Sequence, residues 1–377
     1  MTATPMSDEA DVLLQLDNVE KRFPVQTSSL LRRSREHVHA VDGVSLQIRR
    51  GETLGLVGET GCGKSTLARC ASRLYNIDAG NVSFAGRDIS RLSRRQLRPV
   101  RRQIQMIFQD PYGSLNPRRR VGSIIADPLR IHHVDDRHNR KRVVQDTMEL
   151  VGLNPEHYNR FPAEFSGGQR QRIGVARALI IKPELIICDE PVSALDVSIQ
   201  AQILNLLEDL QDGLGLTYLF IAHDLSVVRH ISDRVAVMYL GRIVEIGATE
   251  QVFTHPRHPY TAALLSAAQE PDPDLVHRKP RIILPGDPPS PVTLPTGCRF
   301  HPRCPKAEAD CVTRAPELAA RLHDPASHRA ACLFPVPDGA ELALATSEAH
   351  GPVGSSVSTP EPDASVSGDP ATDTSNR

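Results

Sequence analysis

The chain begins with two segments in which apolar and polar positions alternate. One runs from Val12 to Val19, and the other is Val44-Ser45-Leu46-Gln47-Ile48. Because successive side chains of a strand point to opposite faces, this alternation predicts two half-buried β-strands, which we expect to form an antiparallel layer. The basic, irregular stretch from Val25 to His39 is expected to be an exposed loop. It lacks the interleaved aromatic residues of a nucleic-acid-binding patch.

Short, largely apolar runs further along predict strands buried on both faces. They include Leu54 to Val57, Leu185 to Cys188 and Thr217 to Ala222, and a closing hairpin is expected around Gly241. Apolar residues at helical spacing predict a core-facing stripe on a long helix. This stripe comprises Ile199, Ile203, Leu206, Leu207 and Leu210. A second helical region has Val143, Met148, Leu150 and Val151 as candidate apolar positions.

A glycine-rich stretch follows the first apolar run. It reads Gly58-Glu59-Thr60-Gly61-Cys62-Gly63-Lys64-Ser65-Thr66 and fits the pattern G-x-x-x-x-G-K-[ST]. The segment from Ser65 to Leu74 behind it is expected to be a helix, so the motif has the strand and helix neighbours of a phosphate-binding loop. Glycines let backbone N–H groups line an anion-binding concavity, and the helix adds its positive end. Lys64 is expected to reach the β- and γ-phosphates of a nucleotide, and the Ser65 hydroxyl to hold Mg²⁺.

Three further sites carry candidate chemistry. Ser166-Gly167-Gly168-Gln169 begins a predicted helix with Ser166 as its N-cap, which exposes backbone donors to an anion; a plain capped helix is the alternative. Asp189 and Glu190 end a buried strand, at the edge where open α/β sheets place their ligands. Asp189 can hold Mg²⁺ through water, and Glu190 can polarise an attacking water. His223 ends another core strand at the same edge, which favours a functional role.

Composition limits the function classes. The chain has 377 residues, 40% of them hydrophobic, and a formal net charge of -1, so no global field argues for nucleic acid as a partner. The first residues, Met1 to Asp11, are polar and acidic, and we expect no signal peptide there. No apolar run is long enough to cross a bilayer. Without an export signal, the seven cysteines are not expected to form disulfides.

Taken in order, these motifs resemble those of an ATP-binding subunit of an ABC transporter. The resemblance covers roughly Val12 to Phe253. It implies an α/β fold: a P-loop ABC ATPase with a mixed core sheet, an antiparallel β layer, a helical subdomain and a small cysteine-containing C-terminal extension. The matching positions are Walker A (Gly58 to Ser65), the Q-loop (Gln109), the signature (Ser166 to Gln169), Walker B (Asp189-Glu190), the D-loop (Ser193 to Asp196) and the switch histidine (His223).

The family's mechanism implies a role for each of these residues. ATP is bound between the Walker A loop of one ATPase and the signature loop of a second, so Ser166, Gly167 and Gly168 would contact a γ-phosphate held by the partner. The catalytic residues would be Glu190 as general base or water-orienting group, His223 as γ-phosphate sensor, Lys64 and Gln109. Mg²⁺ would be held through Ser65, Gln109 and Asp189, and Asp196 would couple the two sites. Phe23 lies where the family's base-stacking aromatic should be, although ordinary packing explains it equally well.

The later part of the chain narrows the resemblance to ATPases of oligopeptide and dipeptide transporters. The segments that carry it are His258 to Leu265, Leu284 to Pro291 and Gly297 to Pro305, and the chain looks most like the second, F-type ATPase of the pair. Thr60, where the family commonly has serine, is a mild departure. A carrier of nickel or another small solute, or a soluble ABC ATPase outside transport, is the alternative.

Four cysteines lie in this later part, namely Cys298, Cys304, Cys311 and Cys332. Their spacing is neither a paired C-x-x-C zinc pattern nor a ferredoxin run. An iron–sulfur cluster, a structural zinc ion and no metal are three competing interpretations. The resemblance implies a four-iron cluster with a structural role.

The expected organisation has a disordered N-terminus (1–11), an ATPase domain (12–253) with a helical subdomain at about 110–180, a C-terminal domain (254–336) and a disordered tail (337–377). The tail is too polar to bury enough apolar surface to order itself. The resemblance implies ATP and Mg²⁺ as ligands. It implies a second homologous ATPase, two transmembrane permeases and an extracytoplasmic substrate-binding protein as partners, and a peripheral location on the cytoplasmic face of the membrane.

Overall fold

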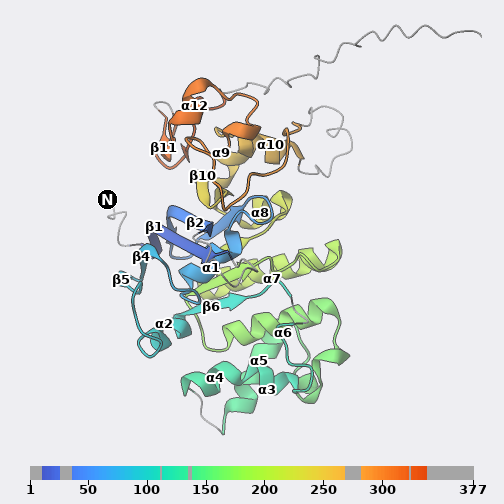
Figure 1. Cartoon of the computed structure of the whole chain (residues 1–377). Coiled ribbons are helices and arrows are strands. Elements are labelled where there is room, and N and C mark those ends of the chain that lie inside the picture. Colours follow the sequence, from blue (N-terminus) through green and yellow to red (C-terminus); the bar gives the residue numbers. More distant parts are fainter. Residues whose placement is uncertain are drawn as a thin grey trace, which may run out of the picture. The chain divides into compact units, whose positions relative to one another are not determined.

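The computed structural model describes residues 11–25, 36–110, 113–134, 138–267, 282–321 and 324–337. The predicted N-terminal disorder, the predicted disordered tail and most of the predicted loop from Val25 to His39 fall outside these ranges. Figure 1 shows the chain coloured from its N-terminus to its C-terminus.

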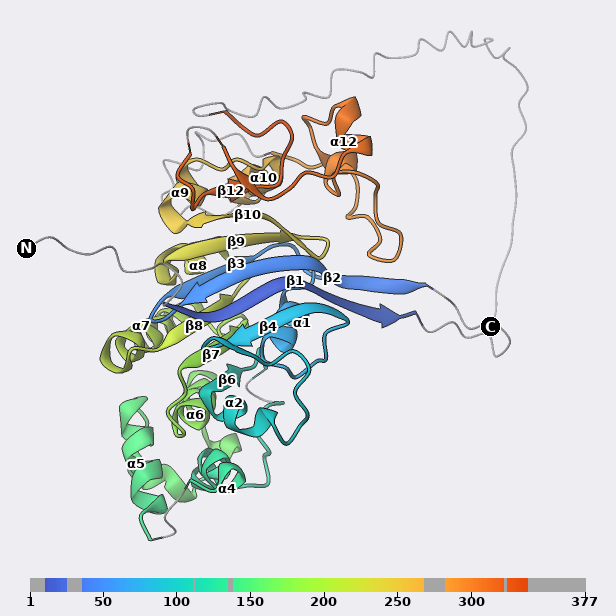
Figure 2. The ribbon, with the colours of Figure 1, turned by 90° about the vertical axis from the view of Figure 1, so that its left-hand side faces the viewer.

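The alternating segments form an antiparallel sheet, as predicted. Its strands are β1 (Val12–Pro24), β2 (His37–Arg49), β4 (Ala79–Phe84) and β5 (Arg87–Asp88), in the order β2-β1-β4-β5 (Figure 2). The first two strands are longer than their alternation predicts, because Phe23 pairs with Val38 and Pro24 with His37. The end of the predicted loop is therefore strand.

The apolar runs form the core sheet. Within the described residues its order is β11-β12-β10-β9-β3-β8-β7-β6. The strands β6 (Ile104–Ile107), β7 (Leu185–Asp189), β8 (Thr217–Ile221), β3 (Thr53–Val57) and β9 (Arg234–Tyr239) run parallel. β10 (Arg242–Ala248) returns antiparallel to β9 as the predicted hairpin. Every residue of β3, β7 and β8 is buried, which agrees with strands covered on both faces.

Helices cover the core sheet. α1 (Lys64–Ala71) contacts strands of both sheets and contributes Leu67 and Cys70 to the core between them. α7 (Val197–Leu214) and α8 (Leu225–Ile231) bury most of their apolar residues in the core on the other face of the sheet. α2 (Leu97–Gln103) precedes β6. On α7, the predicted stripe is buried from Ile203 onward, whereas Ile199 is half-buried.

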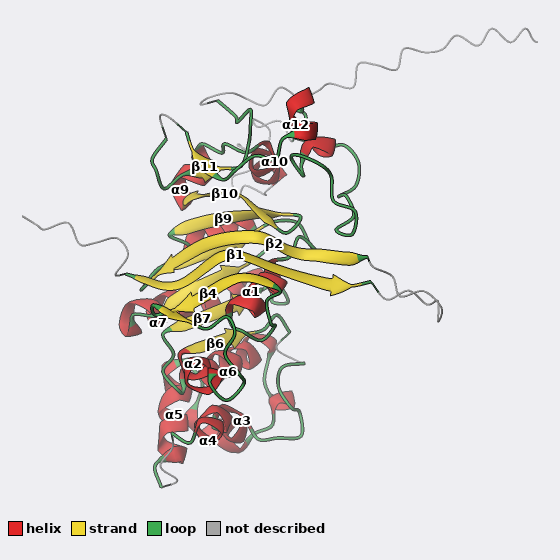
Figure 3. Cartoon of the chain, turned by 60° about the vertical axis from the view of Figure 1, so that its left-hand side comes forward, coloured by secondary structure: helices red, strands yellow, loops and turns green. Residues whose placement is uncertain are grey.

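In the sequence, a group of short helices follows β6 and precedes β7. It contains α3 (Val121–Ile125), α4 (Asp127–His132), α5 (Arg140–Leu150) and α6 (Gly167–Leu179), with 3₁₀ turns at Pro155–Asn159 and Pro162–Glu164 (Figure 3).

Two of the apolar positions predicted for this helical region are wrong. Val143 and Leu150 are exposed, whereas Val144, Met148 and Val151 are buried. The buried residues are spaced by four and three, which places them on one face of the helix. Val143 and Leu150 lie one residue before Val144 and Val151, at the edge of that face.

The later residues add two short strands to the core sheet and also form several helices. They form α9 (Thr249–Thr254), α10 (Pro259–Ala267), the 3₁₀ turn His301–Arg303, α12 (Ala309–Thr313), β11 (Ala319–Ala320) and β12 (Arg329–Ala330), and β12 pairs with β10. The fully buried Glu245 carboxylate accepts hydrogen bonds from the Arg257 and His258 N–H groups at 2.7 and 2.8 Å, and its Oε1 lies 2.8 Å from His328 Nε2. In the described part of the chain, no helix is long and apolar enough to span a bilayer.

Candidate nucleotide-binding site

The glycine-rich loop joins β3 to α1, as predicted. Gly58, Gly61 and Gly63 all have positive φ, and Gly63 is the N-cap of α1. A Cβ atom would lie 2.2 Å from Met238 O at Gly58 and 2.0 Å from Ala40 O at Gly63. Only glycine satisfies both the conformation and the close approach of neighbouring backbone. The loop is therefore shaped by its contacts with β2 and β9.

Lys64 and Ser65 begin α1 and face a polar environment. Lys64 is buried, and its Nζ donates to the carbonyl oxygens of Gly58 at 2.7 Å and Glu59 at 3.1 Å. The Ser65 hydroxyl donates to Asp189 Oδ1 at 2.7 Å. Burial raises the pKa of Asp189, and the Ser65 hydrogen bond opposes that shift. The hydroxyl and carboxylate oxygens are donors of the hard type that Mg²⁺ prefers, so these side chains fit the ion.

Gln109, Glu190 and His223 converge, although they follow three different strands. Gln109 Nε2 donates to Glu190 Oε2 at 2.7 Å, and His223 Nδ1 lies 3.6 Å from the same oxygen. Glu190 has a φ of 49°, a conformation that non-glycine residues seldom adopt outside functional or tightly held sites. Its backbone N–H donates to Ile221 O at 3.0 Å, which holds this conformation against β8.

These groups open onto one cleft of about 840 Å³. Of the predicted residues, those that line it are Phe23, Thr60, Gly61, Gly63, Lys64, Ser65, Thr66, Gln109, Glu190 and His223. Gly58, Glu59, Cys62 and Asp189 do not line it. Cys62 is buried, and the Glu59 side chain forms an ion pair with Arg303 instead.

Phe23 lies at the rim of this cleft. Its ring meets Tyr75 edge-on, with centroids 5.6 Å apart, and the Lys21 ammonium lies 5.4 Å from its centroid. The ring is thus packed on one side and also faces the cleft. Both interpretations made from the sequence are compatible with this position.

The signature segment lies apart from the cleft. Ser166 is the N-cap of α6, as predicted. It also forms a capping box with Gln169: Gln169 N–H donates to Ser166 Oγ, and Ser166 N–H to Gln169 Oε1. A Cβ at Gly168 would lie 2.4 Å from Ile199 Cγ2, so packing against α7 already requires glycine there. Asp196, at the start of α7, is exposed and makes no side-chain cap. None of these residues lines the cleft of its own chain.

Sequence reasoning missed several residues at the cleft. Val38, Ala40, Asp110 and Pro291 also line it, as do Ser193 and Ala194, which were expected only as D-loop positions. Pro291 belongs to the later part of the chain, and its carbonyl accepts a hydrogen bond from His39 N–H at 3.0 Å. Two prolines flank Ser290, but no sequence signal placed this segment beside Phe23.

All four late cysteines lie within the described residues. Burial, followed by the neighbouring Cys298, Cys304 and Cys311 thiols, raises the pKa of Cys332 to about 12. Burial also raises the pKa of Cys304 to about 11. Across the described ranges, however, no group of three or more His, Cys, Asp or Glu side chains is arranged to hold a metal ion. This arrangement supports neither the iron–sulfur cluster nor the zinc alternative.

Comparison with known proteins agrees with the site and with the later part of the chain. Residues 41–193 match the family described as ABC transporter, and residues 244–311 match the family described as oligopeptide/dipeptide transporter, C-terminal region.

Curated relatives match over most of their length. The oligopeptide transport ATP-binding protein AppF of Bacillus subtilis is 52% identical over 321 residues, which is 84% of this chain and 97% of the relative. OppF of Salmonella typhimurium, with the same description, is 50% identical over 86% of this chain and 97% of its own. The dipeptide transport ATP-binding protein DppF of Haemophilus influenzae is 49% identical over 81% of this chain and 92% of the relative.

Solved structures agree with the fold. A dimeric ATP-binding cassette in a post-hydrolysis state, bound to ADP and Pi, is 27% identical with a TM-score of 0.56, covering 63% of this chain and 99% of the cassette. The cassette cbiO1 of Clostridium perfringens is 26% identical with a TM-score of 0.55, covering 65% of this chain and 92% of its own. The predicted P-loop ABC ATPase fold is confirmed, and the chain belongs to the ATP-binding subunits of the oligopeptide/dipeptide ABC transporter family, which couple ATP hydrolysis to transport.

Proposed function

We propose that this chain powers the import of oligopeptides or dipeptides across a cell membrane. One observation carries the proposal. An ABC transporter match at 41–193 and an oligopeptide/dipeptide C-terminal match at 244–311 occur in the same chain. Relatives about half identical to it are described as oligopeptide and dipeptide transport ATP-binding proteins. An ABC ATPase outside transport does not account for the second match.

The residues around the cleft have the chemistry that ATP hydrolysis needs. Phosphoryl transfer depends chiefly on positioning and on neutralising charge, which suits the Lys64 ammonium at the loop. Ser65 and Asp189 would hold Mg²⁺, which neutralises charge on the phosphates when bound. Glu190 would orient the attacking water and accept its proton. Gln109 and His223, which contact the Glu190 carboxylate, would hold it in position.

The assembly we propose contains a second, homologous ATPase. The signature residues Ser166, Gly167, Gly168 and Gln169 do not line the cleft of their own chain, and the exposed Ser166 and Gln169 would contact an ATP bound by the partner. Asp196, exposed at the start of α7, would couple the two sites. Two transmembrane permeases and an extracytoplasmic substrate-binding protein complete the proposed importer, with this chain on the cytoplasmic face.

For the late cysteines, a four-iron cluster remains a prediction from the family resemblance alone. The proximity of the four thiols supports it, and the described arrangement does not. Iron and sulfide analysis of anaerobically purified protein decides the question. A colourless, iron-free protein would remove the cluster.

The proposed function is tested by recovering the tagged chain from its own membranes in mild detergent and identifying the accompanying proteins by mass spectrometry. We expect two polytopic membrane proteins, a related ATPase and a substrate-binding protein, whose ligand is then measured directly. Peptide binding by that protein supports the proposal. Binding of nickel or another small solute replaces the substrate class, and recovery of ribosomes or DNA without a permease overturns the transport function.

A further inference from the structure

The later part of the chain contacts the phosphate-binding loop directly at Glu59. The Tyr260 hydroxyl accepts a hydrogen bond from the Glu59 backbone N–H at 2.8 Å. Arg303 Nη1 contacts both oxygens of the Glu59 carboxylate, at 3.1 and 3.0 Å. Glu59 occupies one of the unspecified positions of the loop motif, so neither contact follows from the motif. One residue of the loop is thus held by two residues more than two hundred positions away.

Both contacting side chains are themselves held in place by burial. Tyr260 is fully buried, and the Arg303 side chain is only 9% exposed. The Tyr260 ring packs against Tyr239 and Phe300, with centroids 4.7 and 5.4 Å away. Phe300 lies immediately before the 3₁₀ turn that carries Arg303. A rigid aromatic cluster therefore sets where both contacts meet the loop.

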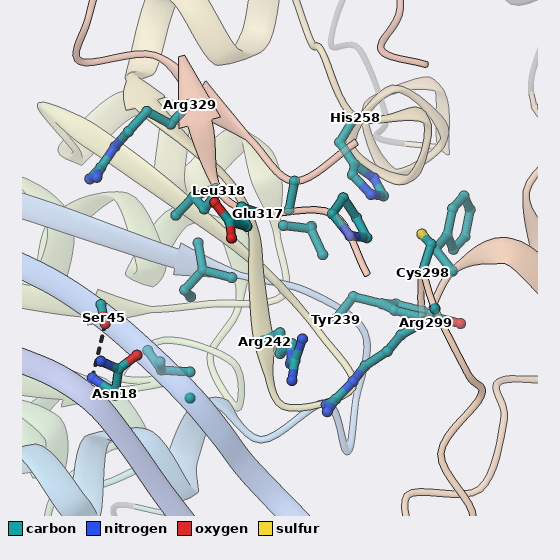
Figure 4. A pocket seen from close by; sticks show the side chains of 18 residues that line it. Asn18, Ser45, Tyr239, Arg242, His258, Cys298, Arg299, Glu317, Leu318 and Arg329 are labelled. Carbon is teal, nitrogen blue, oxygen red and sulfur yellow. Dashed lines mark hydrogen bonds between the residues drawn. The ribbon is translucent and has the colours of Figure 1, made fainter. Parts of the chain in front are cut away.

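The segment that carries Arg303 also contacts the turn between β9 and β10, and that turn itself contacts the phosphate-binding loop. Arg299 donates to Leu240 O, in the turn between β9 and β10, and pairs with Asp42. Gly241, in that turn, donates to Cys62 O of the loop at 2.9 Å. Arg299 and Arg242 both line a cavity of about 420 Å³ near this turn, and Figure 4 shows them side by side. Both contact Asp42 Oδ2, so these two guanidinium groups are paired with the same carboxylate.

The Glu59 backbone is held at both of its polar groups. Tyr260 receives its N–H, and its C=O accepts one of the two backbone hydrogen bonds from Lys64 Nζ. The Glu59 N–H belongs to the same peptide unit as the Gly58 C=O, which accepts the other hydrogen bond from Lys64 Nζ at 2.7 Å. Rotation of this peptide would therefore move an oxygen that sets the position of the Lys64 ammonium. A loop already ordered before the nucleotide arrives loses less conformational freedom on binding.

We propose that Tyr260 and Arg303 are positioning residues for ATP. They act through Glu59, which fixes the backbone of the phosphate-binding loop and with it the Lys64 ammonium. Neither residue lines the cleft. The inference rests on ATP binding at this loop, and it extends the ATP site to two residues outside the cassette motifs.

The test is an ATP titration of the full chain by calorimetry, with thermal unfolding of the nucleotide-free protein measured in parallel. Tyr260→Phe removes one hydroxyl, leaves the aromatic packing and should weaken ATP affinity about fivefold, which corresponds to one buried hydrogen bond. Arg303→Gln should weaken it by a similar factor. Arg303→Lys should restore most of the loss, because a single nitrogen makes both contacts with the carboxylate.

Tyr218→Phe is the matched control. Tyr218 is also fully buried, and its hydroxyl donates to Leu207 O at 3.1 Å, away from the loop. It should lower the unfolding temperature as Tyr260→Phe does, without changing ATP affinity. In a Glu59→Gln background, Arg303→Gln should cause little additional loss, because the two residues act as a pair.

The outcomes separate the inference from the function on which it rests. Folded Tyr260→Phe and Arg303→Gln variants that bind ATP as the wild type does would overturn the positioning role. An equal loss of affinity in Tyr218→Phe would overturn it as well, since the effect would then be one of general stability. A wild-type chain that does not bind ATP would overturn the nucleotide-binding function itself.

Discussion

The Walker A half of the site and the signature segment are organised in opposite ways. Around the glycine-rich loop, residues from separate strands meet: Ser65 contacts Asp189, and Glu190 contacts both Gln109 and His223. Around Ser166 the contacts are local, because its capping box joins residues three positions apart. The Walker A residues of separate strands therefore gather at one cleft, whereas Ser166 makes local contacts and lies outside that cleft. Substitutions in the two halves should consequently give different combinations of lost binding and lost turnover.

The largest effect is expected at Glu190. Glu190→Gln keeps the side chain's size and its contact with Gln109 but removes the group that accepts a proton from water. Turnover in the assembled transporter should fall by about a hundredfold or more, within the usual contribution of a general base. ATP affinity should stay close to that of the wild type. A variant that keeps at least half of wild-type hydrolysis in a steady-state phosphate-release assay would contradict the role given to Glu190.

Substitution of Lys64 should weaken ATP binding as well as turnover. Lys64→Ala removes a buried ammonium that is poised between two loop carbonyls. The lost charge-assisted contacts with phosphate should weaken ATP affinity by roughly ten- to a hundredfold. Calorimetric titration of the isolated chain measures this directly. Unchanged affinity would show that the loop does not bind the phosphates.

Substitution in the signature segment should lower turnover while leaving the ATP affinity of the isolated chain unchanged. Ser166→Ala should leave the ATP affinity of the isolated chain unchanged, because Ser166 lies outside the chain's own cleft. Turnover of the complete two-ATPase assembly should fall about tenfold through the lost hydroxyl contact with phosphate. Loss of the cap should also cost about 1 kcal/mol of folding free energy, measurable by urea unfolding. A weakened affinity in the isolated chain would place the signature in its own cleft and remove the contrast between the two halves.

The smallest effect is expected at Thr60. Its side chain differs from serine by one methyl group, and it lines the cleft without a side-chain hydrogen bond among the described contacts. Thr60→Ser should change ATP affinity by less than about twofold, which is within the effect of one partly exposed methyl group. A change of tenfold in the same titration would show that this position distinguishes the chain from proteins with serine there.

The sequence allowed the local parts of this site to be predicted, but not the long-range parts. The loop, the helix after it and the carboxylates at the end of β7 follow from spacing and from the apolar runs beside them. The contact between Arg303 and Glu59 joins residues 244 positions apart. Nothing in either segment specifies the other, because their meeting depends on how α10 and the late 3₁₀ turn pack onto β9.

The buried positions of α5 were mispredicted because two neighbouring residues are equally apolar. Val143 and Val144 are adjacent and have identical side chains, and only the packing of α5 selects Val144 for the core. The four late cysteines show a different limit of sequence spacing. The spacing brought four thiols into one region, but a metal site also depends on the direction of each thiol, which spacing does not determine.

The pairing of β12 with β10 has a consequence for how the protein is made. β10 belongs to the core sheet, yet its outer neighbour is synthesised only after α9, α10 and α12. At ordinary rates of translation this interval is on the order of ten seconds. During it, the edge of β10 and the Glu245 carboxylate lack His328 and β12. A ribosome-bound nascent chain should therefore remain open to strand-to-strand association until the late segment emerges and closes that edge.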